Sequence, residues 1–399
     1  MVRIIALDIE TSGLDFTRCG IWQIGAIDMG NPSNRFLQDS RIDPDDDTEI
    51  EAMKVTGTNE EMLRDPQKQS QHSLLSNFFQ WYRGVGGHNN LCHNPQFDIS
   101  YLWHKASKYN LEVPFHYRSF DLHSIGQMRH VQLTNDLFGK GNKGMSLTDI
   151  INFCNMEDTR KEHNGLEDSM LAGECFSRLV RGENFLSEYA HYPCGTASLP
   201  SASQNGMKLM VVHIKATGND FSKNGIWQIG AVDLENPENQ FHEICRIDKD
   251  DEVCGDASTQ KYFSNPQLQS QQELLENFFA WYRSMGGTNC VSENPAFDTG
   301  FILTKARKYN LASPIHYRAF DMHSIAQTKY YQLNQQFLGN GTSDMSFNKI
   351  VAFSGLSVER EENNTIQDCI LTGESFHRMM YGKPWLEDFA HQPLPHYLV

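Results

Sequence analysis

Five side chains in the first half of the chain have the types and the spacing that metal-assisted chemistry needs. Asp8 and Glu10 stand two apart in the apolar run VRIIALDIE, Asp98 follows in HNPQFD, and His163 and Asp168 stand in HNGLED. Carboxylate oxygens are the ligands that Mg²⁺ and Mn²⁺ prefer, and an imidazole transfers protons near neutral pH. Together these residues predict a two-metal site for phosphodiester hydrolysis, with a histidine that takes the proton of the attacking water.

The local sequence predicts how these residues reach one place. Side chains two apart on a strand face the same side, so a strand formed by VRIIALDIE presents Asp8 and Glu10 together. Asp98 stands where an apolar run passes into a helix that is expected to begin at about this residue. His163 is expected at or just before the start of another helix, whose first turns carry Asp168.

Each residue taken singly also has a simpler interpretation. The opening strand could end at Asp8 and leave both of its acids solvated. Asp98 could cap its helix, because aspartate is a favoured N-cap residue. His163 and Asp168 could be ordinary surface groups. Only the ordered set of five favours a catalytic site.

The chain contains the same sequence pattern twice. Residues 20–36 recur at 225–241 with 12 of 17 positions identical, and residues 104–127 recur at 304–327 with 16 of 24 identical. Each copy is far longer than the repeat unit of a solenoid, which is roughly 20–50 residues. The pattern therefore predicts two copies of a whole domain.

The boundaries of these domains follow from a change in composition. Residues 194–206 are rich in Gly, Ser, Ala and Pro, which is typical of a flexible linker. We therefore expect one domain over 1–193 and a second over 207–399. In each copy, apolar strand-like runs come first and amphipathic helices follow, which predicts an α/β or α+β layer fold.

Three segments of the first copy, in order, resemble the motifs of a known enzyme family. Asp8-Ile9-Glu10-Thr11, Asn94 through Asp98, and His163 with Asp168 are similar to the three motifs of the DEDDh exonucleases, the DnaQ-like branch of the RNase H-like superfamily. The resemblance covers about residues 1–182. It implies an α/β fold in which each domain is a mixed five-stranded sheet flanked by helices. It also implies stepwise release of nucleoside 5′-monophosphates from a 3′ end.

The resemblance also assigns roles to the five residues. Asp8 would bridge two metal ions, Mg²⁺ or Mn²⁺. Glu10 and Asp168 would bind the ion on the side of the nucleophile, and Asp98 would help to bind the second ion. His163 would be the general base.

Residues beside the motifs are candidates for contacts with nucleic acid, and they are Thr11, Leu14, Asn94, Lys140 and Lys143. The two lysines stand in the glycine-rich segment FGKGNKGM and are suited to phosphate contacts. In the family, an apolar residue at the position of Leu14 often stacks on the terminal base. The second copy has Asn219, Asn340 and Ser343 in place of Leu14 and the two lysines. Ordinary drift on exposed loops explains each of these changes equally well.

The second copy differs at the positions that would carry the chemistry. Its equivalents of Asp8, Glu10, Asp98, His163 and Asp168 are, in order, His213, Lys215, Asp298, Asn363 and Asp368. A lysine at the metal position repels divalent cations. Residues 207–399 are therefore interpreted as a degenerate pseudo-exonuclease domain. We expect it to contact the first copy as a built-in dimer partner, or to bind substrate or a protein partner.

The net charge places limits on the substrate. The chain has 34 Lys and Arg against 50 Asp and Glu, a formal charge of −16, and so lacks the basic footprint of most nucleic-acid binders. The acidic runs at 43–51 and 248–252 are interpreted as solvated loops. We expect modest affinity for long polynucleotides, with short or single-stranded DNA or RNA 3′ ends as the partners.

Cysteine usage and hydropathy bear on location. The nine cysteines are odd in number and form no CxxC pair, which indicates a reducing, intracellular and therefore cytoplasmic setting. The opening residues do not resemble a secretion leader, and no apolar stretch approaches the roughly 18 residues of a membrane span. We expect no membrane association.

Two other functions compete with a metal-dependent 3′–5′ exonuclease. One is a non-catalytic nucleic-acid-binding or adaptor protein, and the other is a proofreading or trimming subunit of a larger complex. The five intact residues weigh against the first, because a binding protein has no need of all five. In the second, residues 207–399 would supply the docking surface.

Overall fold

The structure, a computed structural model, describes the chain in two compact units. The described residues are 2–87, 89–139, 144–160, 163–199, 207–254, 265–286 and 288–399. The amino-terminal unit comprises Met1–Gly126, Met145–Pro200 and Tyr330–Asp344, and the carboxyl-terminal unit comprises Gln127–Gly144, Ser201–Lys329 and Met345–Val399. Each unit thus includes one segment from the other half of the sequence. The domain boundaries at 193 and 207 stay a prediction.

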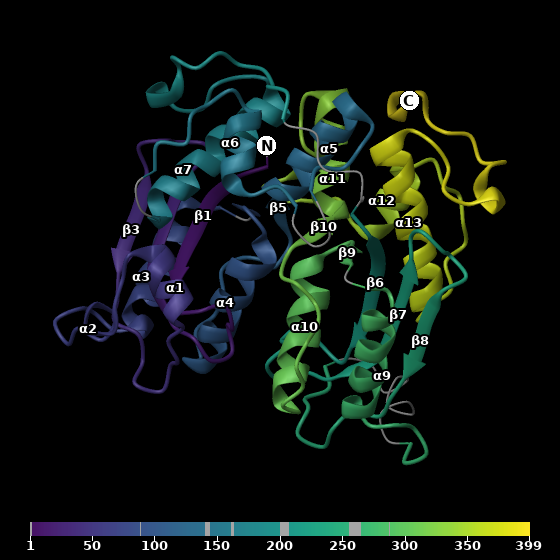
Figure 1. Cartoon of the computed structure of the whole chain (residues 1–399), viewed down its shortest axis with the longest axis horizontal. Helices are drawn as coiled ribbons and strands as arrows, with labels where there is room; N and C mark the ends of the chain where they lie inside the picture. The colour runs from purple at the N-terminus through teal and green to yellow at the C-terminus, as the bar shows by residue number, and fades with distance from the viewer. Residues whose placement is uncertain are drawn as a thin grey trace. The chain divides into compact units, whose positions relative to one another are not determined.

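The amino-terminal unit is built on a mixed five-stranded sheet with the order β3-β2-β1-β4-β5 (Figure 1). β1 pairs antiparallel with β2 and parallel with β4. Both faces of β2 are buried apart from Asp28 at its end, so the sheet is covered on both sides. The strands are β1 Ile4–Thr11, β2 Ile21–Asp28, β3 Arg35–Asp39, β4 Asn89–Cys92 and β5 Ser119–Asp121.

Three helices pack on this sheet and position the residues of interest. α7 packs on β1 and β2, α3 on β2 and β3, and α4 on β4 and β5. α4 begins at Pro95, earlier than the start predicted near Asp98, because proline fits the first turn of a helix. The helices are α1 Ile50–Thr56, α2 Glu60–Leu63, α3 Gln71–Val85, α4 Pro95–Lys108, α6 Leu147–Phe153, α7 Gly165–Phe176, η1 Ser177–Arg181 and η2 Ser187–Tyr189. α5 Leu122–Thr134 begins in this unit, and its residues from Gln127 onward belong to the carboxyl-terminal unit.

The carboxyl-terminal unit has a sheet of the same order, β10-β9-β6-β7-β8. The predicted fold class, two mixed five-stranded α/β sheets flanked by helices, is therefore confirmed. Its strands are β6 Leu209–Ala216, β7 Ile226–Asp233, β8 Gln240–Ile244, β9 Asn289–Ser292 and β10 Ala319–Asp321. β11 Gly339–Asn340 and β12 Thr342–Ser343 form a separate pair in the segment Tyr330–Asp344, which belongs to the amino-terminal unit. The helices are α9 Gln271–Ser284, α10 Pro295–Lys308, α11 Met322–Asn334, α12 Phe347–Phe353, α13 Thr365–Tyr381, η4 Glu387–Phe389 and η5 His396–Leu398.

Two sequence expectations concern the chain as a whole. Among the described residues, no helix is long and apolar enough to cross a membrane. All nine cysteines lie within the described ranges, and each is a free thiol.

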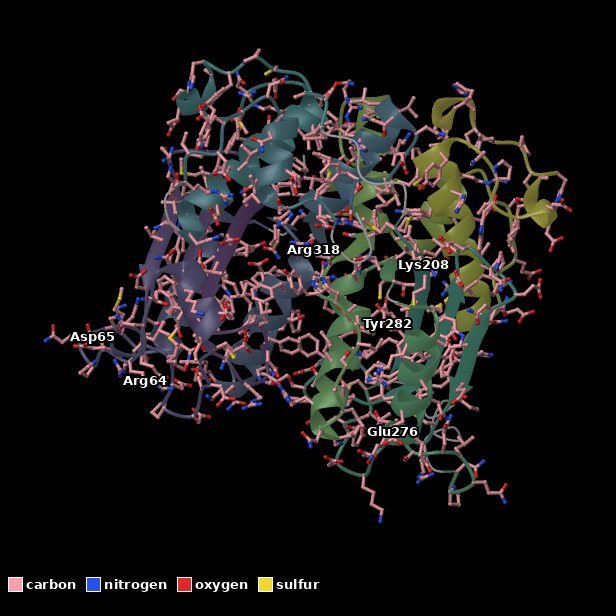
Figure 2. The ribbon with its side chains drawn as sticks, viewed as in Figure 1. Arg64, Asp65, Lys208, Glu276, Tyr282 and Arg318 are labelled. Carbon is pink, nitrogen blue, oxygen red and sulfur yellow. The ribbon has the colours of Figure 1, made fainter. Side chains whose placement is uncertain are left out.

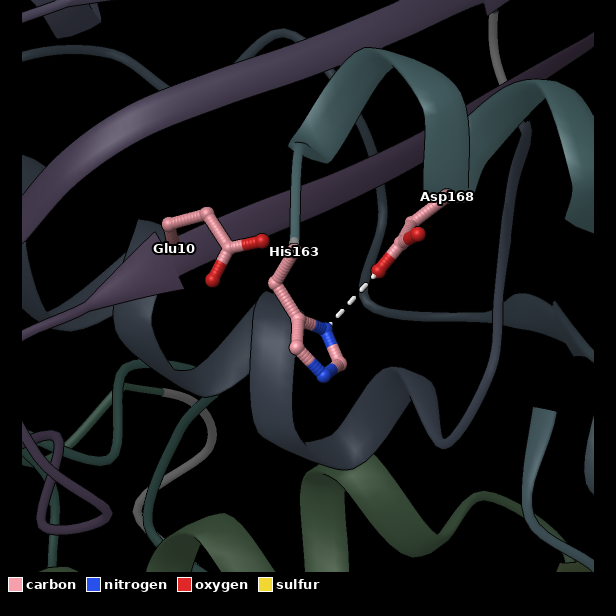
Figure 3. A group of neighbouring side chains, drawn as sticks. All are labelled: Glu10, His163 and Asp168. Carbon is pink, nitrogen blue, oxygen red and sulfur yellow. Dashed lines mark hydrogen bonds and ion pairs between the residues drawn. The ribbon is translucent and has the colours of Figure 1, made fainter. Parts of the chain in front are cut away.

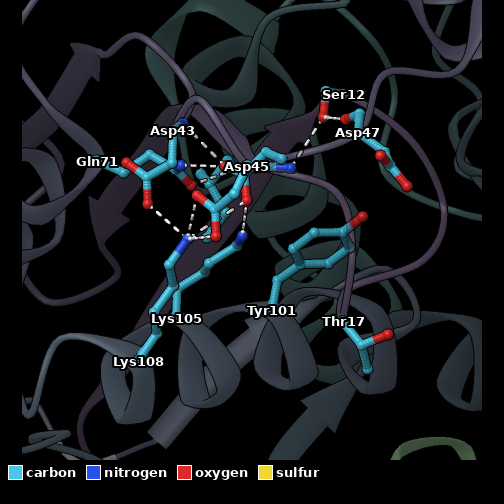
Figure 4. Close-up of polar contacts among 12 residues, drawn as sticks. Ser12, Thr17, Asp43, Asp45, Asp47, Gln71, Tyr101, Lys105 and Lys108 are labelled. Carbon is cyan, nitrogen blue, oxygen red and sulfur yellow. Dashed lines mark hydrogen bonds and ion pairs between the residues drawn. The ribbon is translucent and has the colours of Figure 1, made fainter. Parts of the chain in front are cut away.

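The acidic run at 43–51 is not solvated throughout, so that interpretation is wrong for Asp46. The side chains of Asp46 and Lys105 are 3% and 2% exposed, and the Lys105 Nζ lies 2.5 Å from Asp46 Oδ1. Figure 4 shows Lys105 and Lys108 reaching from α4 toward the acidic loop. The Gln71 amide donates to the other Asp46 oxygen. The carboxyl-terminal unit repeats this pair, because Lys305 lies 2.6 Å from Asp251. The acid run is thus anchored to α4 by a buried ion pair.

Further basic side chains pair with the more exposed acids and carbonyls of the same loop. Lys108 lies 2.7 Å from a carboxylate oxygen of Asp43 and 3.0 Å from one of Asp45. Arg64 directly follows α2 (Figure 2). It donates to the backbone carbonyls of Asp43 and Asp46 at 3.1 and 2.9 Å. Part of the acidity of the chain is therefore compensated locally.

We expect Lys105→Met to destabilise the protein by about 3–5 kcal/mol, because it leaves the Asp46 carboxylate buried without its counter-charge. Urea unfolding of the full chain measures this cost. The combined Lys105→Met and Asp46→Asn variant should recover part of the loss. Lys54→Met is the matched control, since Lys54 pairs with Glu51 on the surface, where an ion pair contributes about 0–1 kcal/mol. If Lys105→Met and Lys54→Met lowered the free energy of unfolding equally, the Lys105–Asp46 pair would not act as a buried ion pair.

Candidate active site

β1 brings the first two acids to one face of the sheet. Asp8 and Glu10 alternate with the buried Leu7 and Ile9, as the strand period requires. Asp8 is half-buried and Glu10 is buried. Neither acid lies at a frayed strand end, because β1 continues to Thr11. The prediction that one strand presents both carboxylates together is thus matched by the geometry.

Two glycines allow the start of α7 to approach β1. A Cβ added at Gly25 would lie 2.0 Å from backbone atoms of Gly165 and Leu166, so a larger residue cannot occupy this position. The Gly165 N–H also donates to the Gln23 side chain at 2.8 Å. This close contact brings the first turn of α7, with the buried Asp168, over β1.

α4 delivers the next acid from the other side. Asp98 stands in its first turn and is buried, and its Oδ1 accepts the backbone N–H of Ile9 at 3.1 Å. Asn94 precedes the helix in the left-handed conformation, with φ of 63°, and its N–H donates to Asp121 at 3.1 Å. Asp98 is therefore fixed directly beside the segment of β1 that carries Asp8 and Glu10. The alternative that it caps its helix is wrong, because the N-cap residue is Asn94.

The convergence of these acids raises their pKa values. Burial and repulsion by Asp168 and Asp98 raise the pKa of Asp8 well above its usual range. Burial and repulsion by Asp168 raise the pKa of Glu10 to about 7. Burial also raises the pKa of Asp98. Such a site favours either bound protons or bound cations.

His163 completes the group from the segment just before α7, where the sequence places it. Its Nδ1 lies 3.2 Å from Asp168 Oδ2, and this hydrogen bond raises the pKa of His163 (Figure 3). One ligand atom each from Glu10, His163 and Asp168 lie within 4.8 Å of one another. The imidazole is 45% exposed, so it remains open to water and to an incoming substrate.

The donor set fits a divalent cation. Carboxylate oxygens are the preferred ligands of Mg²⁺ and Mn²⁺. The Glu10 Oε1 is buried, and no side chain or backbone group of the described residues donates to it. A cation between Glu10 and Asp168 would satisfy this oxygen and relieve the repulsion among the acids.

The predicted substrate-binding residues do not share one environment. Leu14 is 60% exposed and apolar, as a base-stacking residue requires. Thr11 is buried, and its hydroxyl donates to the Gly13 carbonyl at 2.7 Å. The Asn94 side chain is also buried. Lys140 and Lys143 lie outside the described residues.

Motif spacing gave no indication of Arg160, which also contacts the cluster. Its Nη1 donates to Asp168 Oδ1 at 2.9 Å. The one available signal was that the second copy also has an arginine at this position, Arg360.

The equivalent place in the carboxyl-terminal unit is occupied by internal cations. Lys215 Nζ lies 2.9 Å from Asp368 Oδ2, and Arg360 Nε lies 2.5 Å from Asp368 Oδ1. His213 bonds to the Thr372 hydroxyl at 2.7 Å, and burial lowers the pKa of His213 to about 4, so the ring is neutral. Within the described part of this unit, no cluster of potential metal ligands occurs.

Comparisons with known proteins are consistent with this geometry. The exonuclease family model RNase_T matches residues 5–176. The chain is 34% identical to the DNA polymerase III subunit epsilon of Rickettsia typhi over 111 residues, which are 27% of this chain and 45% of that protein. It is 26% identical to the subunit of the same name from Pasteurella multocida over 198 residues, which are 46% of this chain and 70% of that protein. The chain thus spans less than half the length of the first of these relatives.

Solved structures of nucleases are also similar. Cell-death related nuclease 4 (CRN-4) aligns with a TM-score of 0.38 and 14% identity, over 46% of this chain and 65% of that one. The nuclease domain of 3′hExo, a DEDDh family member, aligns with a TM-score of 0.34 and 12% identity, over 47% of this chain and 98% of that one. Over residues 5–176, which are less than half of this chain, the sequence is similar to the exonuclease family, and the chain is also similar to curated proteins named DNA polymerase III subunit epsilon.

Proposed function

We propose that the amino-terminal unit uses divalent cations to remove nucleoside 5′-monophosphates, one at a time, from the 3′ ends of single-stranded DNA or RNA. The observation that carries this proposal is the approach of Glu10, His163 and Asp168 to within 4.8 Å, beside Asp8 and Asp98. Three separate segments of the sequence supply these side chains. A purely structural role would not require four acids to gather where the Arg160 guanidinium donates to Asp168 but, among the described residues, the buried Glu10 Oε1 has no donor.

The four carboxylates would hold two Mg²⁺ or Mn²⁺ ions in this site. When bound, these ions would supply charge stabilisation for the transition state and lower the pKa of the attacking water. Asp8 would contact both ions, Glu10 and Asp168 the ion on the nucleophile side, and Asp98 the other.

His163 would take the proton of the attacking water. Its Nδ1 faces Asp168, while Nε2 points away from that carboxylate (Figure 3). Asp168 therefore orients the ring, and Nε2 is the atom available to accept a proton. The exposed side chain of Leu14 would stack on the terminal base, next to the strand that carries the acids.

For the carboxyl-terminal unit, we propose a non-catalytic role. Lys215 and Arg360 already neutralise Asp368, so that site has little to offer a divalent cation. The unit would act as a built-in dimer partner, or bind substrate or a protein partner. Because the curated relatives are named as subunits of DNA polymerase III, a proofreading subunit is the second candidate function, with residues 207–399 as the docking surface.

We expect Asp98→Asn to lower exonuclease activity at least about 100-fold, because it removes a ligand charge from the metal site. The assay follows 5′-labelled DNA and RNA oligonucleotides with Mg²⁺, Mn²⁺ or EDTA. Asp298→Asn is the matched control, since Asp298 accepts the Ile214 N–H at 3.1 Å as Asp98 accepts that of Ile9. Activity that survives EDTA, or equal losses in the two variants, would overturn the proposal.

His163→Ala should separate proton transfer from cation binding. We expect kcat to fall about 10²–10⁴-fold, the usual contribution of a general base. Binding of Mn²⁺, measured by calorimetry, should change little, because the four carboxylates remain. If Mn²⁺ binding and kcat fell together, His163 would be acting as a ligand instead.

A further inference from the structure

Arg160 reaches the site while it is held by a second acid outside the site. Its Nε and Nη2 donate to the two oxygens of Asp158 at 2.9 and 2.6 Å. Thr148 donates to Asp158 at 2.6 Å and lies 3.1 Å from Arg160 Nη2. Only Nη1 remains for Asp168, which it contacts at 2.9 Å. The fork of paired donors on the guanidinium, Nε and Nη2, thus forms a bidentate contact with Asp158.

This arrangement gives the two oxygens of Asp168 different partners. Oδ1 accepts the single bond from Arg160. Oδ2 faces His163 at 3.2 Å, in the cluster that also includes Glu10. One oxygen of Asp168 therefore remains directed toward the place where a cation would bind.

The carboxyl-terminal unit shows the same arginine without this restraint. Val358 stands where the first copy has Asp158. Arg360 turns its fork onto Asp368 instead, with Nε 2.5 Å from Oδ1 and Nη2 2.9 Å from Oδ2. Lys215 adds a third contact, to Oδ2 at 2.9 Å. Both oxygens of Asp368 are therefore occupied by cationic side chains.

We propose that Asp158 is a positioning residue that sets the affinity of the amino-terminal site for divalent cations. It holds the fork of Arg160 away from Asp168 and offsets the charge of the guanidinium. Without Asp158, the fork of Arg160 would engage both oxygens of Asp168, as Arg360 does with Asp368, and would compete with the cation. This proposal rests on the function proposed above.

The test introduces into the first copy the residue found in the second. In the full chain, Asp158→Val should weaken Mn²⁺ binding at least about tenfold, measured from the EPR signal of free Mn²⁺ without nucleic acid. The double variant Asp158→Val, Arg160→Met should bind Mn²⁺ within about threefold of the unmodified chain. Val358→Asp is the matched control in the second copy and should leave Mn²⁺ binding unchanged.

A second measurement separates positioning from a loss of folding. The thermal midpoint of each variant is recorded in EDTA. If Asp158 only supported the fold, Asp158→Val would lower this midpoint, and Arg160→Met would not restore Mn²⁺ binding. Asp158→Asn, which keeps an oxygen to accept from Thr148 but loses the charge, should give an intermediate Mn²⁺ affinity.

The outcomes distinguish this proposal from the one on which it rests. If the unmodified chain binds Mn²⁺ and Asp158→Val binds it equally well, the positioning role fails and the exonuclease proposal stands. Failure of the double variant to recover Mn²⁺ binding also overturns the positioning role. If the unmodified chain binds no Mn²⁺, both proposals fail.

Discussion

The repulsion among carboxylates at one face of β1 is the constraint on which the rest of the site depends. Burial raises the pKa values of Asp8, Glu10 and Asp98, and repulsion by Asp168 raises all three further. Such a cluster persists only with protons or positive charge nearby. In the amino-terminal unit Arg160 supplies one contact, to Asp168, and we propose that a divalent cation supplies the rest of this charge. In the carboxyl-terminal unit, by contrast, Lys215 and Arg360 both contact Asp368.

The backbone that positions the acids is common to both units, so the difference between them lies in side chains. β1 and β6 both shift register one residue before their ends, at Glu10/Thr11 and Lys215/Ala216. The bonds from Ile9 to Asp98 and from Ile214 to Asp298 have the same length, 3.1 Å. The two sites thus differ in the charge of their side chains on a backbone that both units retain.

The sequence predicted the features that a regular spacing of residues reveals. It did not predict the features that depend on contacts between residues far apart in the sequence. Strand alternation placed Asp8 and Glu10 together, and the repeat indicated two similar sheets. β5 has three residues, too few to show a period, and the short β3 was also missed. The burial of Asp46 depends on Lys105, 59 positions away. Arg160 acts through loop contacts that motif spacing does not encode.

A cationic side chain beside a metal ligand competes with the metal ion, so its position matters as much as the ligands themselves. A guanidinium beside Asp168 reduces the repulsion among the carboxylates before a cation binds. It must then leave at least one oxygen of Asp168 free to contact the cation. Arg160 is 10% exposed and committed to Asp158, whereas the side chain of Arg360 is 33% exposed and committed to Asp368. Because a guanidinium is always charged, its effect on a neighbouring acid is set by geometry rather than by pH. In this proposal, Asp158 therefore determines whether Arg160 leaves an oxygen of Asp168 available to a cation or binds both of its oxygens.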